Sequence, residues 1–544
     1  MKKYLILAIL ILAFALRFWK LDTYPALNAD EASIGYDAYS LIQTGRDQHG
    51  NSWPIHFQSF NDYKPGGYVY MVLSFVKLFG LNEWSVRIPS AFLGVLSVYV
   101  LYLLVLELKI KNPEIAAGFL AISPWHLHFS RGGWEVNVAT FFILVGVYLF
   151  LKFVNSNKWF YLSLSFLAFV FSLYTYHSAR LITPLLGLGL VLIYRIDFFK
   201  KENLKTIILN SLFLILLVIP LARDMIKPEI SSRASGVGIL ADAGPLNRVN
   251  EQRGQHDNFE GLVSKTVHNK YINYGLAFLN NYTKHFHGLF LFLSGDDIQR
   301  NKVPETGQMY LFDLVFVLIG LWLIVKEFNN KPYQLVGYWL LISPIAAALT
   351  FQSPHALRAQ NMVIPLVIIS SIGFTYILSL FPKFSIWHIA FIFLIIWQFA
   401  RYQHMYWVHM AKEYPFSSQY GLHELVDYLN SGVGDQYKNY IVTDRYDQPY
   451  ILVLFYGAST NPSKYDPKTF QGDHKLTPRD QYGFSTVRGF GKYVFTSIRK
   501  WEETRQMYKN SLVAGTDEEI YPSTNVVKEI YGSNGYKYFQ IIAN

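Results

Sequence analysis

The sequence predicts a polytopic α-helical membrane protein with a soluble α/β domain at its C-terminal end. Three observations support this fold class. The 544 residues are 52% hydrophobic and only 16% charged, whereas soluble domains average roughly 25% charged residues. Apolar segments long enough to cross a bilayer as helices, which takes about 20 residues, recur from Tyr4 to Arg401. Residues 402–544 lack such segments and contain helix and strand patterns instead.

About eleven candidate spans follow from the apolar segments and their polar flanks. They cover residues 4–20, 87–109, 114–130, 134–153, 159–176, 181–195, 204–222, 310–327, 333–350, 361–381 and 384–401. The first resembles a signal peptide, but Arg17, Trp19 and Lys20 end it and many spans follow, so we expect it to be retained. The apolar segment 66–80 is short and contains Lys77, so we expect it to lie at the interface or to enter the membrane only partway.

The charges of the loops predict which side of the membrane each loop faces. If the N-terminus is cytoplasmic, every inner loop carries lysine or arginine, as the positive-inside rule requires. The outer face then receives a large first loop (21–86) with interfacial helices, a long loop (223–309) and everything after residue 401. We therefore expect a multi-pass protein of the plasma (inner) membrane, with a transmembrane domain at 1–401 and an extracytoplasmic domain at 402–544.

The C-terminal domain is predicted to be a small α/β domain. The segment GLHELVDYLNSG (421–432) has a helical pattern that ends at glycine. Strand-like runs follow at 439–444, 491–497 and 536–544. We find no phosphate-binding glycine loop, nucleotide-binding fingerprint or serine elbow there, so the sequence assigns this domain no chemistry.

The net charge of +10 and the absence of cysteine exclude several classes of function. The basic residues lie mostly in short loops between apolar segments, where they set topology. We therefore expect no nucleic-acid partner. Without cysteine, the chain has no disulfide, no thiolate metal site and no thiol nucleophile.

Residues 27–50, LNADEASIGYDAYSLIQTGRDQHG, place two adjacent acids, Asp30 and Glu31, directly after the first apolar segment. Asn28 followed by Glu31 is a capping-box variant and Gly45 fits a helix end, so the acids have a structural explanation. A second explanation is catalytic, because carboxylates at a membrane are costly unless they have a task. One of them would then be a general base that takes a proton from an acceptor hydroxyl.

One base is sufficient if the donor is a sugar joined to a lipid phosphate. The leaving group is then a stable anion and needs no acid, in contrast to glycoside hydrolysis. The remaining need is a cation for the phosphate, which arginine holds in a bidentate fork and lysine as a point charge. The candidates are Lys64, Arg87, Arg131, Arg180 and Arg358. Each of them could instead reach toward lipid headgroups or mark a helix end.

Polar and aromatic residues expected on the same face are candidates for sugar or acceptor binding. They are Tyr63, Glu135, Asn137, Tyr176, His177 and His355. Aromatic rings can stack on sugars, although an aromatic belt at the membrane interface is the ordinary explanation. Asp296 and Asp297 could bind a divalent metal, but acids in loops are usually solvated. We therefore assign no metal ligand and expect no required cofactor.

The order of these motifs resembles a known family. The acid pair after the first span is followed by YKPGGYVYMVLSFVKLFG (63–80), RIPSAFLGVLSVYVLYLLV (87–105), SPWHLHFSRGGWEVNVATFF (123–142) and SPHALRAQNMVIPL (353–366). Over residues 1–401 this is similar to the C-type (GT-C) integral-membrane glycosyltransferases, in the branch of protein O-mannosyltransferases and lipid A aminoarabinose transferases. The family often has two prolines after the lysine, whereas this chain has Pro65, Gly66 and Gly67.

The resemblance implies a GT-C fold, a polyprenyl-phosphate sugar donor, an outward-facing active site and inversion at the anomeric carbon. It implies Asp30 as catalytic base with Glu31 as its partner, and phosphate contacts from Lys64 and Arg358. It also implies a bacterial cell-envelope enzyme that needs no metal for chemistry. The acceptor could be a protein, a lipid or a polysaccharide.

Two other functions stay open at this point. A transporter or flippase for lipid-linked sugars would have paired halves and charge near the bilayer midplane, whereas here the charges gather at one surface. An oligosaccharyltransferase or polysaccharide ligase would use the same kind of lipid donor but move a whole glycan. The sequence separates this last possibility poorly from single-sugar transfer.

Overall fold

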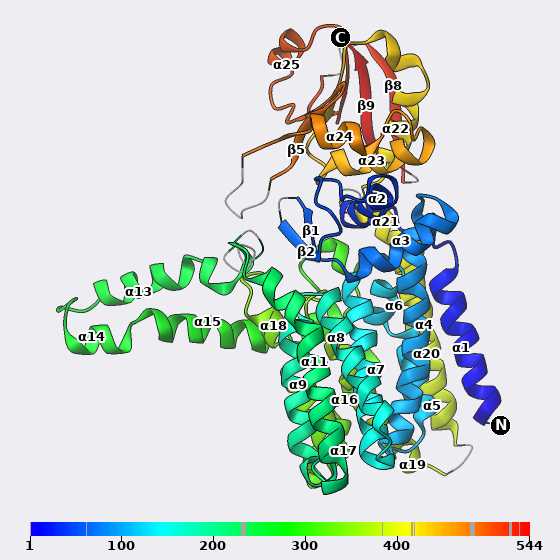
Figure 1. Ribbon diagram of the computed structural model, residues 1–544, viewed down its shortest axis with the longest axis vertical. Coiled ribbons are helices and arrows are strands. Elements are labelled where there is room, and N and C mark those ends of the chain that lie inside the picture. The colour runs from blue at the N-terminus through cyan, green and yellow to red at the C-terminus, as the bar shows by residue number, and fades with distance from the viewer. Residues whose placement is uncertain are drawn as a thin grey trace. The chain divides into compact units, whose positions relative to one another are not determined.

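The computed structural model divides the chain into two compact units, each described here by itself (Figure 1). The structure describes the whole chain except residues 1, 61, 229, 231–235, 383–384, 415–416, 418, 479–484, 522–524 and 533. The first unit, called the helical unit, comprises Met1–Leu16, Leu93–Ser130 and Glu135–Gln403. The second, called the sheet unit, comprises Arg17–Phe92, Arg131–Trp134 and His404–Asn544. The predicted first outer loop therefore belongs to the same compact unit as the C-terminal residues.

Every predicted span coincides with a helix or with two consecutive helices. These are α1 (Lys2–Phe18), α4 (Glu83–Glu107), α5 (Pro113–Ile122), α6 (Pro124–Ser130), α7 (Glu135–Ser156), α8 (Trp159–Thr175), α9 (Ala179–Ile193), α11 (Leu204–Met225), α16 (Leu311–Lys326), α17 (Lys331–Ile342), α18 (Ile345–Ala348), α19 (Val363–Ser379) and α20 (Ile386–His404). Within the described residues, four helices are long and apolar enough to cross a membrane, namely Glu83–Glu107, Glu135–Ser156, Lys201–Met225 and Gln360–Ser379. The polytopic helical fold is confirmed, and the number of eleven spans stays a prediction.

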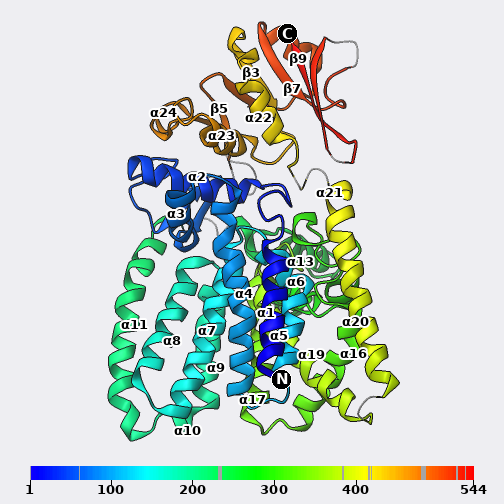
Figure 2. The ribbon, with the colours of Figure 1, turned by 90° about the vertical axis from the view of Figure 1, so that its right-hand side faces the viewer.

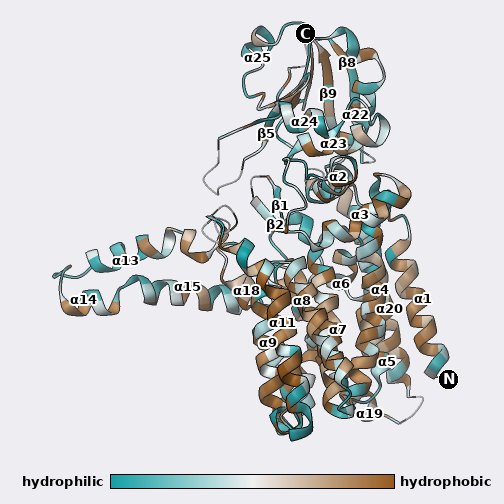
Figure 3. Ribbon diagram, viewed as in Figure 1, coloured by the Kyte–Doolittle hydropathy of each residue, from teal (hydrophilic) through white to brown (hydrophobic). Residues whose placement is uncertain are grey.

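The helices of the helical unit pack through apolar faces, which Figure 3 colours brown. Helix α7 contacts α8, α16 contacts α19, and α9 contacts α17. At the α16–α19 contact two glycines let the backbones approach closely. A methyl group on Gly373 would overlap the carbonyl oxygen of Phe316, and one on Gly320 would overlap that of Ile369. Small residues serve the same purpose in membrane helix pairs generally.

Gly373→Ala is therefore expected to destabilise the helical unit by about 1–3 kcal/mol, the usual cost of overpacking. The added methyl would push α19 away from α16 along a contact made by backbone atoms, which cannot move aside as a side chain can. Thermal unfolding of the purified protein in detergent measures the effect. Gly187→Ala in α9 is the matched control, because no described heavy atom lies within 4 Å of the added methyl. Equal unfolding temperatures for the two variants would contradict the close-packing argument.

The long loop 223–309 contains three helices that extend sideways from the bundle in Figure 1. They are α13 (Gly244–Gly254), α14 (Leu262–Val267) and α15 (Lys270–Lys284). The described part of the loop also contains a π-helical turn, Leu289–Leu293, and the short helices Ile239–Ala241 and Gln299–Asn301. Residues 229 and 231–235 of this predicted loop lie outside the described residues.

Residues 21–86, which are predicted to form the first outer loop, contain a helix, a hairpin and a second helix. They are α2 (Ala29–Thr44), β1 (His56–Ser59), β2 (Asp62–Pro65) and α3 (Gly67–Phe79). Strands β1 and β2 pair antiparallel, with Phe57 opposite Lys64. Helix α3 covers the apolar segment predicted at 66–80 and is 13 residues long.

The C-terminal residues form an α/β fold, as predicted. In the described part of the chain, a mixed sheet has the strand order β4-β5-β6-β3-β7-β9-β8, with β3 parallel to both β6 and β7. The strands are β3 (Asn439–Thr443), β4 (Lys475–Leu476), β5 (Val487–Phe490), β6 (Tyr493–Thr496), β7 (Ser511–Gly515), β8 (Val526–Tyr531) and β9 (Lys537–Ala543). The helices are α21 (Met410–Glu413), α22 (Leu422–Asn430), α23 (Pro449–Thr460), α24 (Pro467–Asp473) and α25 (Trp501–Met507). The predicted helix at 421–432 is α22, and the three predicted strands are β3, β6 and β9.

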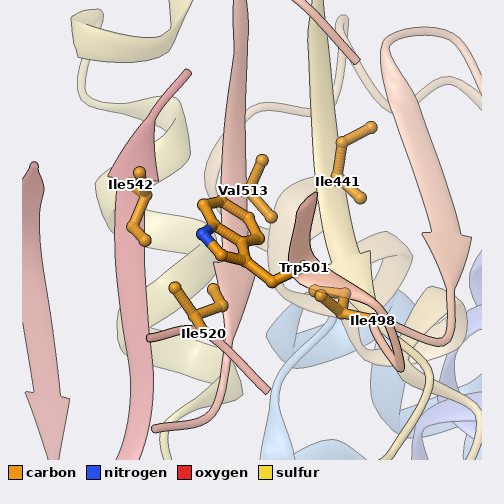
Figure 4. Packing of buried hydrophobic residues seen from close by; sticks show 6 residues of the cluster. All are labelled: Ile441, Ile498, Trp501, Val513, Ile520 and Ile542. Atoms are coloured by element: carbon orange, nitrogen blue, oxygen red, sulfur yellow. The ribbon is translucent and has the colours of Figure 1, made fainter. Parts of the chain in front are cut away.

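Two apolar contacts hold the sheet unit together. On one side of the sheet, the indole of Trp501 lies among branched aliphatic side chains of β3, β7 and β9 (Figure 4). Elsewhere, the buried helix α23 packs against α2, and α24 also contacts α2 (Figure 2). The α2–α23 contact is close, since a methyl on Gly35 would lie 2.6 Å from the ring of Phe455. Helix α2, which carries Asp30 and Glu31, is therefore fixed by the C-terminal part of the chain.

Candidate active site

The predicted cap at the start of α2 is confirmed. The side chain of Asn28 accepts a hydrogen bond from the backbone N–H of Glu31 (3.1 Å), and the Glu31 carboxylate accepts one from the backbone N–H of Asn28 (3.2 Å). Gly45 ends the helix with a left-handed φ of 70°. The backbone N–H of Ala29 donates to Gln419 (2.7 Å), which in turn donates to the carbonyl of Asp447. Residues far along the chain thus fix the first turn of the helix.

Asp30 and Lys64 form an ion pair at the start of α2. Lys64 reaches the carboxylate from β2, and its ammonium also lies 5.2 Å from the ring centre of Phe60. Both side chains are partly exposed, at 22% for Asp30 and 17% for Lys64. The pair therefore joins an acid and a cation that are accessible from outside the protein.

Glu31 is buried, and its partners differ from those of Asp30. Its carboxylate accepts two hydrogen bonds from the guanidinium of Arg87, at 2.7 and 2.8 Å, and one from the backbone N–H of Gly133 at 2.8 Å. The remaining amino group of Arg87 donates to the carbonyls of Leu21 (2.8 Å) and Pro25 (2.9 Å). Since Glu31 is 1% and Arg87 0% exposed, this buried ion pair ties α2 to the start of α4 and to the turn at residues 131–134.

Arg131 is likewise buried among protein groups. It donates to the hydroxyl of Tyr406 (3.0 Å) and to the carbonyls of Trp19 (2.8 Å) and Tyr24 (3.1 Å), and it lies 4.8 Å from the ring centre of Trp407. Through these contacts Arg131, like Arg87, stabilises the fold of the loop that begins at residue 21. Of the three cations predicted in this unit, Lys64 is the one that the structure brings to Asp30.

Asp37 is an acid of this site that the sequence reasoning did not single out. It lies seven residues after Asp30, on the same face of α2, and is fully buried. Its carboxyl accepts hydrogen bonds from the backbone N–H and the side-chain amide of Gln48, at 3.0 and 3.1 Å. Burial and the neighbouring Asp47 raise the pKa of Asp37 well above its usual value, although Gln48 and the positive charge of Lys64 oppose the rise. The spacing of seven residues between Asp30 and Asp37 places both on one face of a helix and could have indicated Asp37 from the sequence.

Ser33 connects α2 with the hairpin that carries Lys64. Its position on α2 lies between Asp30 and Asp37, on the same helix face. The hydroxyl of Ser33 contacts that of Ser59 on β1 at 3.0 Å, and Gln48 donates to it at 3.1 Å. The hairpin that carries Lys64 is thereby linked to α2 through a buried polar network.

The other predicted site residues divide between the two units. Tyr63 lies on β2 beside Lys64, opposite Gln58 of β1. The remaining ones belong to the helical unit, namely Glu135, Asn137, Tyr176, His177, Arg180, His355 and Arg358. Their roles in sugar, acceptor or phosphate binding stay predictions.

Within the helical unit, hydrogen bonds to neighbouring groups hold several of these residues. Arg180 bonds the ring of His177 (3.2 Å) and donates to the carbonyl of Leu173 (3.2 Å). Arg358 donates to the hydroxyl of Thr350 at 2.8 Å. Asn137 is fully buried and accepts from Gln360 at 3.4 Å.

Asp296, considered for metal binding, is buried and serves the local fold. It accepts hydrogen bonds from the backbone N–H groups of Ile298 (2.9 Å) and Ala356 (2.6 Å) and from the amide of Asn301 (3.0 Å). Burial raises the pKa of Asp296. Among the residues that the structure describes, no group of three or more His, Cys, Asp or Glu side chains could hold a metal ion. Whether the chemistry needs a metal stays a prediction.

Comparison with known proteins identifies a matching family and solved structures with a similar fold. The family described as dolichyl-phosphate-mannose-protein mannosyltransferase matches residues 7–225. No curated protein matches the sequence. Among solved structures, ArnT from Cupriavidus metallidurans bound to undecaprenyl phosphate is similar, with a TM-score of 0.50, 12% identity and coverage of 98% of this chain and 97% of that one.

The oligosaccharyltransferase AglB from Archaeoglobus fulgidus, in complex with an inhibitory peptide and a dolichol-phosphate, is also similar. The TM-score is 0.50, the identity is 14%, and the match covers 84% of this chain. It covers 64% of the AglB chain, which is less than two thirds. The expected resemblance is thus confirmed at the level of the fold, and the chain has the GT-C fold of integral-membrane glycosyltransferases.

Proposed function

We propose that the protein transfers a sugar from a polyprenyl-phosphate donor to a hydroxyl acceptor at the outer face of the membrane, with Asp30 as the general base. The observation that carries the proposal is the partly exposed ion pair of Asp30 with Lys64. It supplies a proton acceptor and a cation side by side, which are the two groups that this reaction needs. The fold shared with ArnT and AglB, whose structures contain undecaprenyl phosphate and dolichol-phosphate, supports a lipid phosphate as the leaving group.

In the proposed reaction, one bond forms as another breaks at the anomeric carbon. The acceptor oxygen attacks this carbon while its proton passes to the carboxylate of Asp30. The bond from the carbon to the phosphate oxygen breaks, and polyprenyl phosphate leaves as an anion. Attack from the side opposite the phosphate inverts the configuration. Lys64 is placed to stabilise the negative charge that develops on the phosphate, which is electrostatic stabilisation by a preorganised cation.

Glu31, Arg87 and Asp37 would act as positioning residues. The Glu31–Arg87 pair fixes the first turn of α2 and therefore the direction of Asp30. Asp37 bonds Gln48, which donates to Ser33, and Ser33 contacts Ser59 of the hairpin that carries Lys64. Small displacements of reacting groups are costly, so such supports contribute to catalysis without contacting substrate.

The test is transfer by the purified full-length protein in lipid nanodiscs. A panel of undecaprenyl-phosphate sugars with radiolabelled sugar is supplied, and release of undecaprenyl phosphate and labelled product are both measured with a membrane extract as acceptor. Enzymatic transfer produces both in equal amounts. Movement of intact donor across the membrane of proteoliposomes, with no release of undecaprenyl phosphate, would instead identify a flippase.

The same assay distinguishes single-sugar transfer from transfer of a whole glycan. Donors that carry one sugar and donors that carry an oligosaccharide are compared at equal concentration. A single-sugar transferase uses the former and not the latter. Exclusive use of the oligosaccharide donor would favour an oligosaccharyltransferase or polysaccharide ligase.

Lys64→Ala is expected to lower kcat/KM for the donor by roughly 10- to 100-fold. A hydrogen bond to a charged group contributes about 1.5–3 kcal/mol, and each 1.4 kcal/mol corresponds to about tenfold. Lys64→Arg keeps the charge and should recover part of the rate. Lys77→Ala, at an exposed position on α3, is the control and should leave the rate unchanged. If Lys64→Ala and Lys77→Ala behave alike, Lys64 does not hold the phosphate.

A further inference from the structure

We infer that the C-terminal region contains a second binding site, a pocket that takes one sugar ring of a glycan. The pocket has a volume of about 230 Å³ and lies between β3, α23, α24 and the turn from β5 to β6. Among the described residues, those that line it lie between 440 and 493. Asp30, Lys64 and their supports are not among them. Binding there can therefore be tested separately from the proposed transfer reaction.

The wall of the pocket is a cluster of aromatic rings. Tyr493 lies at its centre, with ring centres 5.1 Å from Tyr440, 6.3 Å from Tyr465 and 5.3 Å from Phe490. Phe470 of α24 meets Phe490 edge to face at 5.3 Å. The tyrosine rings and Phe470 are buried, whereas Phe490 is half-buried and open to the pocket. The rings are held by one another, so the wall is formed before any ligand binds.

Charged side chains of both signs surround this aromatic wall. Two lysines, Lys464 and Lys492, lie 5.9 and 5.6 Å from the ring centre of Tyr440. Two acids, Asp466 and Asp473, are fixed by backbone N–H groups, since Asp466 caps α24 and Asp473 accepts from Gly491 at 2.6 Å. The four charges sum to zero, so the pocket does not select a strongly charged ligand.

The same four side chains keep capacity for further hydrogen bonds. An ammonium has three donors and a carboxylate about four lone-pair sites. Among the described residues, the ammonium of Lys464 donates to the side chain of Asn430 (3.1 Å), and the ammonium of Lys492 donates to two backbone carbonyls (3.1 Å each). A ligand whose groups both donate and accept can use these lysines and aspartates together. Hydroxyl groups have this property.

The aromatic rings together with the surrounding hydrogen-bond donors and acceptors indicate the chemical class of the ligand. A pyranose ring has apolar C–H faces and hydroxyl groups around its perimeter. Its face can therefore pack on the half-buried ring of Phe490, which the buried aromatic rings support, while its hydroxyl groups meet the donors and acceptors of the rim. The pocket is smaller than the roughly 300–1,000 Å³ of sites for drug-sized ligands, which fits one ring. A lipid chain would leave the remaining hydrogen-bonding capacity of these four side chains unused, and a phosphate group would meet two carboxylates.

Saturation-transfer difference NMR on the full-length protein in detergent tests this inference. The probes are the methyl glycosides of glucose, mannose, galactose and N-acetylglucosamine, with methyl glucuronate and glycerol phosphate as charged comparisons. At least one neutral glycoside should receive saturation through its ring C–H protons and compete with the others. Absence of any transfer to all the neutral glycosides would overturn the inference, as would preferential binding of glycerol phosphate.

Substitutions then assign the binding to this pocket. Thr469→Trp places a large ring in the pocket from the exposed side of α24 and should reduce the signal at least fivefold. Lys468→Trp is the matched control, because it adds the same ring to the same helix at a position that does not line the pocket. Phe490→Ala should weaken binding as well, while Tyr521→Ala, at a position 65% exposed, should not. Equal signals from Thr469→Trp and Lys468→Trp would refute the assignment.

A variant without transfer activity separates this site from the proposed function. Asp30→Asn should bind the glycosides as the unchanged protein does, because Asp30 is not among the residues that line the pocket. Loss of glycoside binding in Asp30→Asn, with Thr469→Trp unaffected, would place the sugar at the Asp30 site and overturn the inference. Retained binding by a protein that proves to have no transferase activity would uphold the pocket and reject the transferase.

Discussion

Asp30→Asn is expected to lower the rate of sugar transfer by about 10²- to 10⁴-fold, the usual contribution of a positioned general base. Asparagine has nearly the shape of aspartate, and its amide oxygen can still accept a hydrogen bond from Lys64. The start of α2 should therefore keep its fold. The variant loses the carboxylate that takes the acceptor's proton, so kcat should fall while donor binding changes little. Initial rates at saturating donor, together with donor binding at equilibrium, measure the two effects separately.

The control for this variant is Asp22→Asn, which removes another carboxylate of the same outer loop. It should retain the full rate. Normal turnover by Asp30→Asn would remove Asp30 from the mechanism. Equal losses of donor binding and rate would assign the Asp30–Lys64 pair to binding alone and leave the base to be found among other residues.

The parts of this site that are local in sequence were predictable. Asn28 and Glu31 are three residues apart, so their mutual cap follows from helix geometry, as does the end of the helix at Gly45. The apolar segments likewise predict α1, α4 to α9, α11 and α16 to α20, because length and hydropathy are properties of a contiguous stretch.

The partners of Glu31 could not be predicted in this way. They are Arg87 and Gly133, which are 56 and 102 residues away in the sequence. Adjacent acids such as Asp30 and Glu31 point to different sides of a helix, but the sequence does not say what each side meets. The carboxylate of Glu31 therefore looked equivalent to that of Asp30, and Arg87 looked like one more candidate for phosphate.

The compact unit formed by the first outer loop and the C-terminal residues was also missed. The run YILVLFYGA (450–458) is the relevant signal, since it is too short to cross a membrane and too apolar for an exposed helix. In the structure this run is α23, which is buried against α2. An apolar helix in a soluble region predicts that something covers it. Only the fold shows that the cover is the helix that carries Asp30.

Glu31→Ala is expected to destabilise the protein by about 3–5 kcal/mol, the usual cost of removing one partner of a buried ion pair. Arg87 would remain buried with an uncompensated charge, and the backbone N–H of Gly133 would lose its acceptor. Arg87→Ala should cost a similar amount, because the carboxylate of Glu31 is then left alone. Thermal and denaturant unfolding of the purified protein in detergent measures both, with Lys500→Ala, at an exposed ion pair with Glu503, as a control near zero.

The double variant Glu31→Leu with Arg87→Met separates a structural role from a chemical one. Two apolar side chains of similar size leave no buried charge, so this variant should be more stable than either single alanine variant. It should not recover full stability, because the carbonyls of Leu21 and Pro25 and the N–H of Gly133 lose their partners. If Glu31 only positions Asp30, transfer should recover along with stability. A double variant that is as stable as the unchanged protein but inactive would mean that Glu31 takes part in the chemistry itself.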